Sequence, residues 1–152
     1  MESKLSLELN ELFQRDIDRL IANLKEMPEE ILWKVPEGVN NSCGVLAQHL
    51  VGNLRFFIGK GLGKRSLERD RRQEFRNTGK SREQLISELK ELQEMLGTIF
   101  SGLESKQIDE AYDLDIPFEM SPKQFLVHLY GHLNYHLGQC NYLRRLMSNS
   151  QS

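Results

Sequence analysis

Four stretches of this chain carry apolar residues at steps of three and four, which places those residues on one face of an α-helix. The predicted helices span about residues 3–27, 42–60, 81–103 and 121–148. No segment shows the strand and helix alternation of a parallel sheet, and only the short run 112–116 alternates like a strand. The pattern therefore predicts an all-α fold, a four-helix bundle, with a single domain over residues 1–152.

Start and stop residues support these boundaries. Pro28 ends the first helix because proline cannot continue one. Ser81, followed three residues later by Gln84, is typical of a capping box at the start of the third helix. Ser121 followed by Pro122 is an equally good start for the fourth helix.

Charge and apolar content exclude several classes of protein. The 152 residues are 39% hydrophobic, which is enough for a core, and 20 basic residues against 22 acidic ones leave a net charge of −2. That balance argues against a nucleic-acid partner. No apolar run is long enough to span a membrane, and the N-terminus lacks the apolar segment of a signal peptide. Cys43 and Cys140 form no paired motif, so we expect no disulfide scaffold and a cytoplasmic location.

Histidine is scarce, and its positions are unusual. The chain has four histidines, and three of them, His128, His132 and His136, lie in the fourth predicted helix. His132 and His136 occupy the apolar stripe of that helix, and His49 takes an inner position in the second helix. Residues four apart on a helix have Cβ atoms about 5–6 Å apart. A third inward histidine from a neighbouring helix would complete a triangle.

Two interpretations of this triangle follow. An unpaired buried imidazole costs about 1–3 kcal/mol, and a divalent metal ion relieves that cost because neutral imidazole is a good ligand. Three histidines without a fourth protein ligand leave a position for water, as in catalytic zinc sites. In the alternative, the histidines are ordinary core residues bonded to carbonyls or hydroxyls. The HxxxH spacing alone is a weak motif, and Leu133 after His132 excludes the HExxH pattern of the zinc proteases.

The histidine motifs resemble a known family. The stretch HLNYHLGQCNYLRRL (residues 132–146) is similar to the last helix of the DinB/YfiT-like metalloenzyme superfamily, which carries HxxxH-x-GQ and then LR. The stretch SCGVLAQHLVGNLRFFIG (residues 42–59) resembles the second helix of that family, and ERDRRQEF (residues 68–75) resembles a loop of one subgroup. The resemblance covers all four helices in order. It implies His49, His132 and His136 as ligands of a divalent metal ion, Zn or Ni, in a homodimer.

Other candidate site residues have two interpretations each. His128 lies off the centre of the stripe, so we expect it to flank the site, with metal ligation as the alternative. Asn53 either lines a pocket or is a core amide, and Gln139 contacts a helix or hydrogen-bonds near the site. Cys140 is expected to pack rather than ligate. Gly138 is expected to permit close approach of another helix.

The connections between helices carry most of the remaining charge. The basic segment 64–76 and the acidic segment 104–120 are expected to be solvated loops. Within the first, Arg72 and Glu74 are expected to form an exposed pair, or alternatively a lid over the end of the bundle. Asp115 and Glu119 are only speculative as general bases.

Two functions are compatible with these residues. In the first, a metal-dependent enzyme activates water for hydrolysis or a low-molecular-weight thiol for transfer to an electrophile; both reactions are implied by the resemblance. In the second, the protein is a non-catalytic metal-binding or stress-response bundle. The family name refers to induction by DNA damage, which concerns expression and does not imply binding to DNA.

Overall fold

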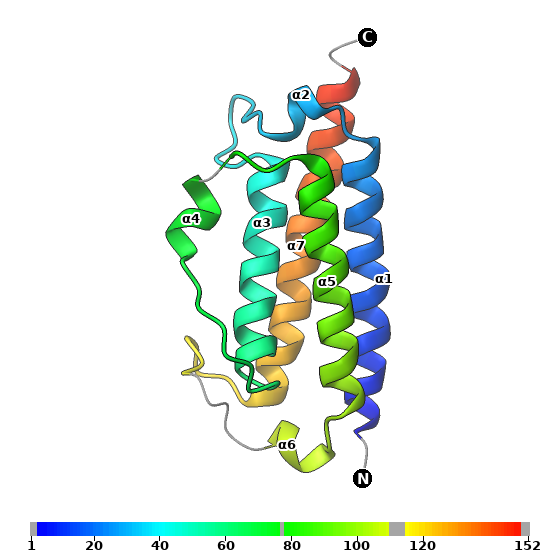
Figure 1. Cartoon of the computed structure of the whole chain (residues 1–152), viewed down its shortest axis with the longest axis vertical. Helices are drawn as coiled ribbons and strands as arrows, with labels where there is room; N and C mark the ends of the chain where they lie inside the picture. Colours follow the sequence, from blue (N-terminus) through cyan, green and yellow to red (C-terminus); the bar gives the residue numbers. More distant parts are fainter. Residues whose placement is uncertain (1–2, 77, 110–114, 150–152) are drawn as a thin grey trace.

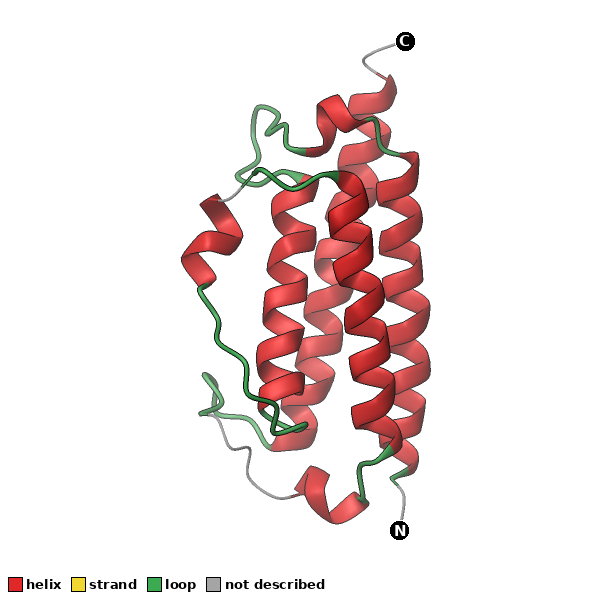
Figure 2. Ribbon diagram, in the orientation of Figure 1, coloured by secondary structure: helices red, strands yellow, loops and turns green. Residues whose placement is uncertain are grey.

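Within the described residues, four long helices pack side by side along the long axis of the molecule (Figure 1). The structure is a computed structural model that describes residues 3–76, 78–109 and 115–149. The long helices are α1 (Lys4–Glu26), α3 (Cys43–Leu54), α5 (Arg82–Ser101) and α7 (Pro122–Asn149), and the π-helix η1 (Arg55–Lys60) continues α3. The described residues contain no strand (Figure 2). The prediction of an all-α fold is confirmed for the described residues, and their four long helices are arranged as a bundle (Figure 1).

Local capping explains where the long helices begin. The hydroxyl oxygens of Ser3, Ser42 and Ser81 accept hydrogen bonds from backbone N–H groups in the first turns of α1, α3 and α5. At Ser81 the capping box is complete, because the Gln84 side chain also accepts from the Ser81 backbone. Observed and predicted helix ends differ by at most two residues. The expected extended run 112–116 lies mostly outside the described residues, and residues 115–116 form no strand.

Three short helices lie in the connections between the long ones. They are α2 (Glu29–Leu32), α4 (Arg71–Arg76) and α6 (Ser105–Asp109). None of the helices in the described ranges combines the length and the apolar composition needed to span a bilayer.

The apolar stripes of the four helices meet in one core. Phe13 of α1 stacks on Phe100 of α5, with ring centroids 5.6 Å apart, and meets the edge of Tyr130 of α7. Leu50 and Leu96 are fully buried between these helices. Each such side chain contributes about 1.5–3 kcal/mol through removal from water, so the bundle is stabilised mainly by this core.

A buried carboxylate joins α1 to α7. Asp16 is fully buried and accepts hydrogen bonds from Tyr130 and from Asn134, both on α7. Arg15 and Arg19 also donate to it from α1. Burial raises the pKa of Asp16, but the hydrogen bonds from Arg15, Tyr130 and Asn134 outweigh burial and lower it overall. Asp16 is therefore an ionised hub that fixes the register of the two helices.

The segment 64–76, here called the strap, runs back along α3 after η1 and ends in α4 (Figure 1). The side chains of Arg69 and Glu74 are only 12% and 8% exposed. The prediction of a fully solvated loop is therefore wrong for this part of the strap. The expected pairing of Glu74 with Arg72 is also wrong, because Arg69 binds the Glu74 carboxylate. The strap packs against α3 because this ion pair is buried against it.

Candidate metal centre

The structure brings the buried His49 together with the half-buried His132 and His136, between α3 and α7. His49 lies on α3, and His132 and His136 lie on successive turns of α7. The Nε2 atom of His132 is 3.3 Å from Nε2 of His49 and 3.0 Å from Nε2 of His136. One ring nitrogen from each of the three residues lies within 4.8 Å of the others. The three imidazoles thus face a common point.

In two of these rings the Nδ1 atom, which faces away from the common point, has a hydrogen-bond partner. His49 Nδ1 lies 3.0 Å from Oε1 of Glu74, and His136 Nδ1 lies 2.7 Å from Oε1 of Gln139. Both partners are acceptors, so each Nδ1 carries the proton and donates. The Nε2 atoms of His49 and His136 therefore present lone pairs to the common point.

Hydrogen bonding among the three rings cannot satisfy these lone pairs. His132 Nε2 has at most one proton, so it can donate to His49 or to His136 but not to both. A metal ion accepts all three lone pairs at once. An ion that holds imidazoles tetrahedrally at about 2.0–2.1 Å places their nitrogens about 3.3 Å apart. The observed separations of 3.0 and 3.3 Å therefore fit a three-histidine metal site.

Burial favours the neutral form of the two histidines on α7. Burial, together with smaller electrostatic effects of His136, His49, His128 and Arg69, lowers the pKa of His132 to about 4. Burial also lowers the pKa of His136, against the opposing effect of its hydrogen bond with Gln139. A metal ion binds only the neutral imidazole, so these two histidines remain available as ligands below the ordinary pKa of histidine.

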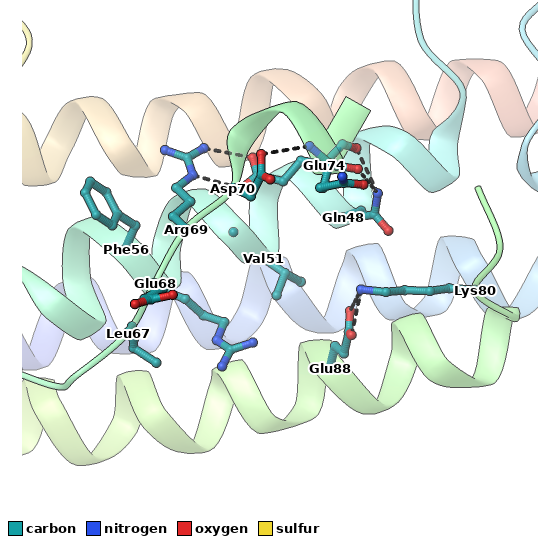
Figure 3. A pocket seen from close by; sticks show the side chains of 13 residues that line it. Gln48, Val51, Phe56, Leu67, Glu68, Arg69, Asp70, Glu74, Lys80 and Glu88 are labelled. Atoms are coloured by element: carbon teal, nitrogen blue, oxygen red, sulfur yellow. Dashed lines mark hydrogen bonds and ion pairs between the residues drawn. The ribbon is translucent and has the colours of Figure 1, made fainter. Parts of the chain in front are cut away.

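Glu74 is a site residue that sequence reasoning placed on the surface. Its carboxylate accepts a hydrogen bond from His49 Nδ1. It also accepts from two nitrogens of Arg69, at 2.8 and 2.9 Å (Figure 3). Burial raises the pKa of Glu74, but the bonds from Arg69 and His49 outweigh burial and lower it overall. The ionised carboxylate fixes the ring orientation and tautomer of His49. Gln48 strengthens the attachment by donating to the Glu74 backbone carbonyl at 2.8 Å.

A glycine on α3 makes room for this carboxylate. A Cβ atom on Gly52 would overlap Oε2 of Glu74, so only glycine lets Glu74 lie this close to the helix. Gly138 shows the opposite: a Cβ there would meet no atom of a neighbouring element within 4 Å. The prediction that Gly138 permits close helix approach is wrong. The close approach occurs at Gly52, one turn after His49.

The other predicted site residues surround the cluster. Gln139 hydrogen-bonds His136, as one of its two interpretations anticipated. His128 is not part of the histidine triangle; its ring packs against Phe118 and Phe125 beside it. Asn53 is buried, and its Oδ1 atom has no hydrogen-bond partner in the described part of the chain.

The cysteines pack against each other and are not part of the histidine cluster. Cys43 and Cys140 are both fully buried, and the Cys43 thiol lies 3.6 Å from the Cys140 carbonyl oxygen. The hydrogen bond with Cys43, together with burial, raises the pKa of the Cys140 thiol well above its usual value. Cys140 therefore stays protonated and packs in the core.

A cavity of about 490 Å³ adjoins the cluster and is lined in part by His49, Asn53, His128 and His132. Small molecules could reach the cluster through this cavity.

Comparison with curated proteins found no match. A family model, the DinB superfamily, matches residues 12–140, a range that includes the three histidines and the strap. The chain belongs to the DinB superfamily.

Proposed function

We propose that His49, His132 and His136 bind one divalent metal ion through their Nε2 atoms. The observation that carries this proposal is the set of inward lone pairs. The Nδ1–H groups of His49 and His136 donate to oxygen atoms of Glu74 and Gln139, so the Nε2 atom of each ring carries a lone pair that faces the common point. Imidazole ligands suit Zn and Ni, the two ions we favour.

The proposed function is that of a metal-dependent enzyme of the hydrolase or thiol S-transferase type. No other histidine, cysteine, aspartate or glutamate of the described residues joins the three histidines in the cluster, which leaves a coordination position for water or a thiol. A bound ion of this kind would lower the pKa of that water or thiol. The residues of the chain hold the three rings in place and exclude bulk water on the core side.

The first test measures metal content. Purified, tag-free protein is analysed by mass spectrometry beside His49→Ala, His132→Ala and His128→Ala, and folding is checked by circular dichroism. We expect about one equivalent of metal per chain, lost in the first two variants and retained in His128→Ala, because His128 lies outside the triangle. A wild-type protein that binds no metal after reconstitution, or folded His49→Ala and His132→Ala variants that keep it, would contradict the proposal.

A second test separates an enzyme from a structural metal site. The ion is replaced by Co²⁺, whose absorption spectrum reports its ligands, and 2-mercaptoethanol is added. An open position predicts a new sulfur-to-cobalt charge-transfer band. A spectrum that the thiol leaves unchanged would indicate a closed site and favour the non-catalytic function. An open site justifies a screen with thiols and electrophiles, followed by esters and amides.

A further inference from the structure

The cavity beside the histidine cluster, here called the side cavity, has features of a ligand site. It lies between α3, α7, the strap and the loop that precedes α7, and its volume of about 490 Å³ falls within the usual range for small-molecule pockets. His49 and His132 form one wall. A ligand in the side cavity would therefore contact the histidine cluster.

The charges that line the side cavity are of one sign. Arg69 and Arg71 line it together with three histidines, and no carboxylate is among its described lining residues. Arg69 already forms an ion pair with Glu74. Arg71 lies over the ring of Phe75, but within the described ranges no hydrogen bond or ion pair engages its guanidinium group. Arg71 is thus free to bind an anion such as a carboxylate.

The rest of the lining is largely apolar. Phe57, Phe125 and Leu129 form the inner wall, and Phe118, which is 50% exposed, stands at the edge against the ring of His128. A half-exposed phenylalanine beside a cavity favours contact with an apolar ligand, because that contact removes the ring from water.

Asn53 contributes a buried polar atom to the wall of the side cavity. The residue is 8% exposed, and its buried Oδ1 atom has no partner in the described part of the chain. Buried polar atoms in folded proteins are normally hydrogen-bonded. Since Asn53 lines the side cavity, the natural partner is a donor on a bound molecule or on an ordered water.

We infer that the side cavity binds a small organic anion with an aromatic or aliphatic body, whose anionic group contacts Arg71 and whose apolar body packs on the phenylalanines. This inference deepens the proposed function, since it names the class of ligand for the same site. The inference rests on the proposed function only in the claim that the bound anion takes part in catalysis. Binding of the anion itself requires no metal ion.

The test uses metal-free protein, so that the anion cannot bind a metal. The probes are 4-phenylbutyrate, its neutral amide 4-phenylbutanamide, and butyrate, which lacks the ring. Binding is followed by proton–nitrogen NMR titration, with the side-chain amide of Asn53 assigned through Asn53→Asp. We expect 4-phenylbutyrate to bind more tightly than either analogue and to shift the Asn53 signal.

Arg71→Gln provides the test of charge, and Arg72→Gln on the same short helix is its control because Arg72 does not line the side cavity. We expect Arg71→Gln to weaken binding of 4-phenylbutyrate on the order of fivefold and to leave the amide unaffected, while Arg72→Gln changes neither. Equal binding of acid and amide, no effect of Arg71→Gln, or an unmoved Asn53 signal would each overturn the inference. Metal content is measured separately, so a chain that takes up metal but ignores 4-phenylbutyrate refutes only this inference.

Discussion

The same substitution, glycine to alanine, should have opposite effects at two helical positions of this chain. Gly52 and Gly138 both lie inside long helices. At Gly138 a Cβ atom meets no neighbouring element within 4 Å, whereas at Gly52 it overlaps the Glu74 carboxylate. The pair therefore isolates the effect of displacing Glu74 from the effect of removing a helical glycine.

The magnitudes follow from the contacts. Alanine in place of a helical glycine stabilises by about 1 kcal/mol, and Gly138→Ala should show this gain. Gly52→Ala has the same gain but must move the carboxylate away from Arg69 and His49. Breaking a buried ion pair costs about 3–5 kcal/mol. Arg69 is 12% exposed and recovers part of this through water, so we expect a net loss of about 2–3 kcal/mol.

The assay is urea denaturation of metal-free protein, followed by circular dichroism. Metal affinity is then measured by competition with a chelator of known affinity. Displacing Glu74 removes the hydrogen bond that orients His49, and loss of such a bond typically lowers metal affinity about 10- to 100-fold. Gly138→Ala should leave metal affinity unchanged.

The reasoning would be refuted if Gly52→Ala stabilised the protein as much as Gly138→Ala does. It would also be refuted if Gly52→Ala bound metal as tightly as the wild type, because Glu74 would then have no role in orienting His49. Glu74→Gln is the companion variant: it keeps the shape of the side chain and removes its charge, and it should weaken metal binding in the same direction.

Three further predictions concern the rest of the bundle. The pKa of His132 is lowered from 6.5 to about 4, so the unfolded chain binds more protons than the folded one in that pH range. Metal-free protein should therefore lose about 2–3 kcal/mol of stability as the pH falls from 6.5 to 4. A His132→Gln variant should show a flatter dependence of stability on pH, and identical dependences would contradict this. Tyr130→Phe removes a donor from the buried Asp16 carboxylate and should cost about 2 kcal/mol in urea denaturation, and a loss within error of zero would count against the hub. We propose that the homodimer forms through the exposed apolar side chains Tyr142 and Leu146 in the C-terminal part of α7. Tyr142→Lys should then yield monomers in analytical ultracentrifugation, while Val127→Lys, near the other end of α7, should not, and a wild-type monomer would contradict the dimer.

The helices could be predicted because their signals are local. A capping residue and the first turn that it caps are three residues apart, and an apolar stripe repeats within one helix. Ser81 with Gln84 placed the start of α5 to the residue. The same local periodicity put His132 and His136 on an inward face, and these are the rings that meet His49 in the structure.

The partners of Glu74 could not be predicted. His49 is 25 residues earlier in the chain and on another element, so no periodic pattern links the two. Arg69 and Arg72 carry the same charge, and both lie within five residues of Glu74 in the sequence. Only the path of the strap over α3 buries Arg69 with Glu74 and leaves Arg72 exposed.

The roles of the two glycines could not be predicted from the sequence either. Gly52 and Gly138 look alike in the sequence, since each follows a histidine within one turn. Whether a glycine is required depends on which atoms of another element approach it, and that is a property of the tertiary structure.

By itself, the sequence determined the all-α bundle, the helix ends and the inward set of three histidines, because each depends on interactions within a turn or two of helix. The tertiary structure alone decided that Glu74 holds the His49 ring, that Gly52 admits the Glu74 carboxylate, and that a cavity lined by Arg69 and Arg71 opens beside the cluster. These features depend on contacts between segments far apart in the chain, and such contacts exist only once the core has brought the helices together.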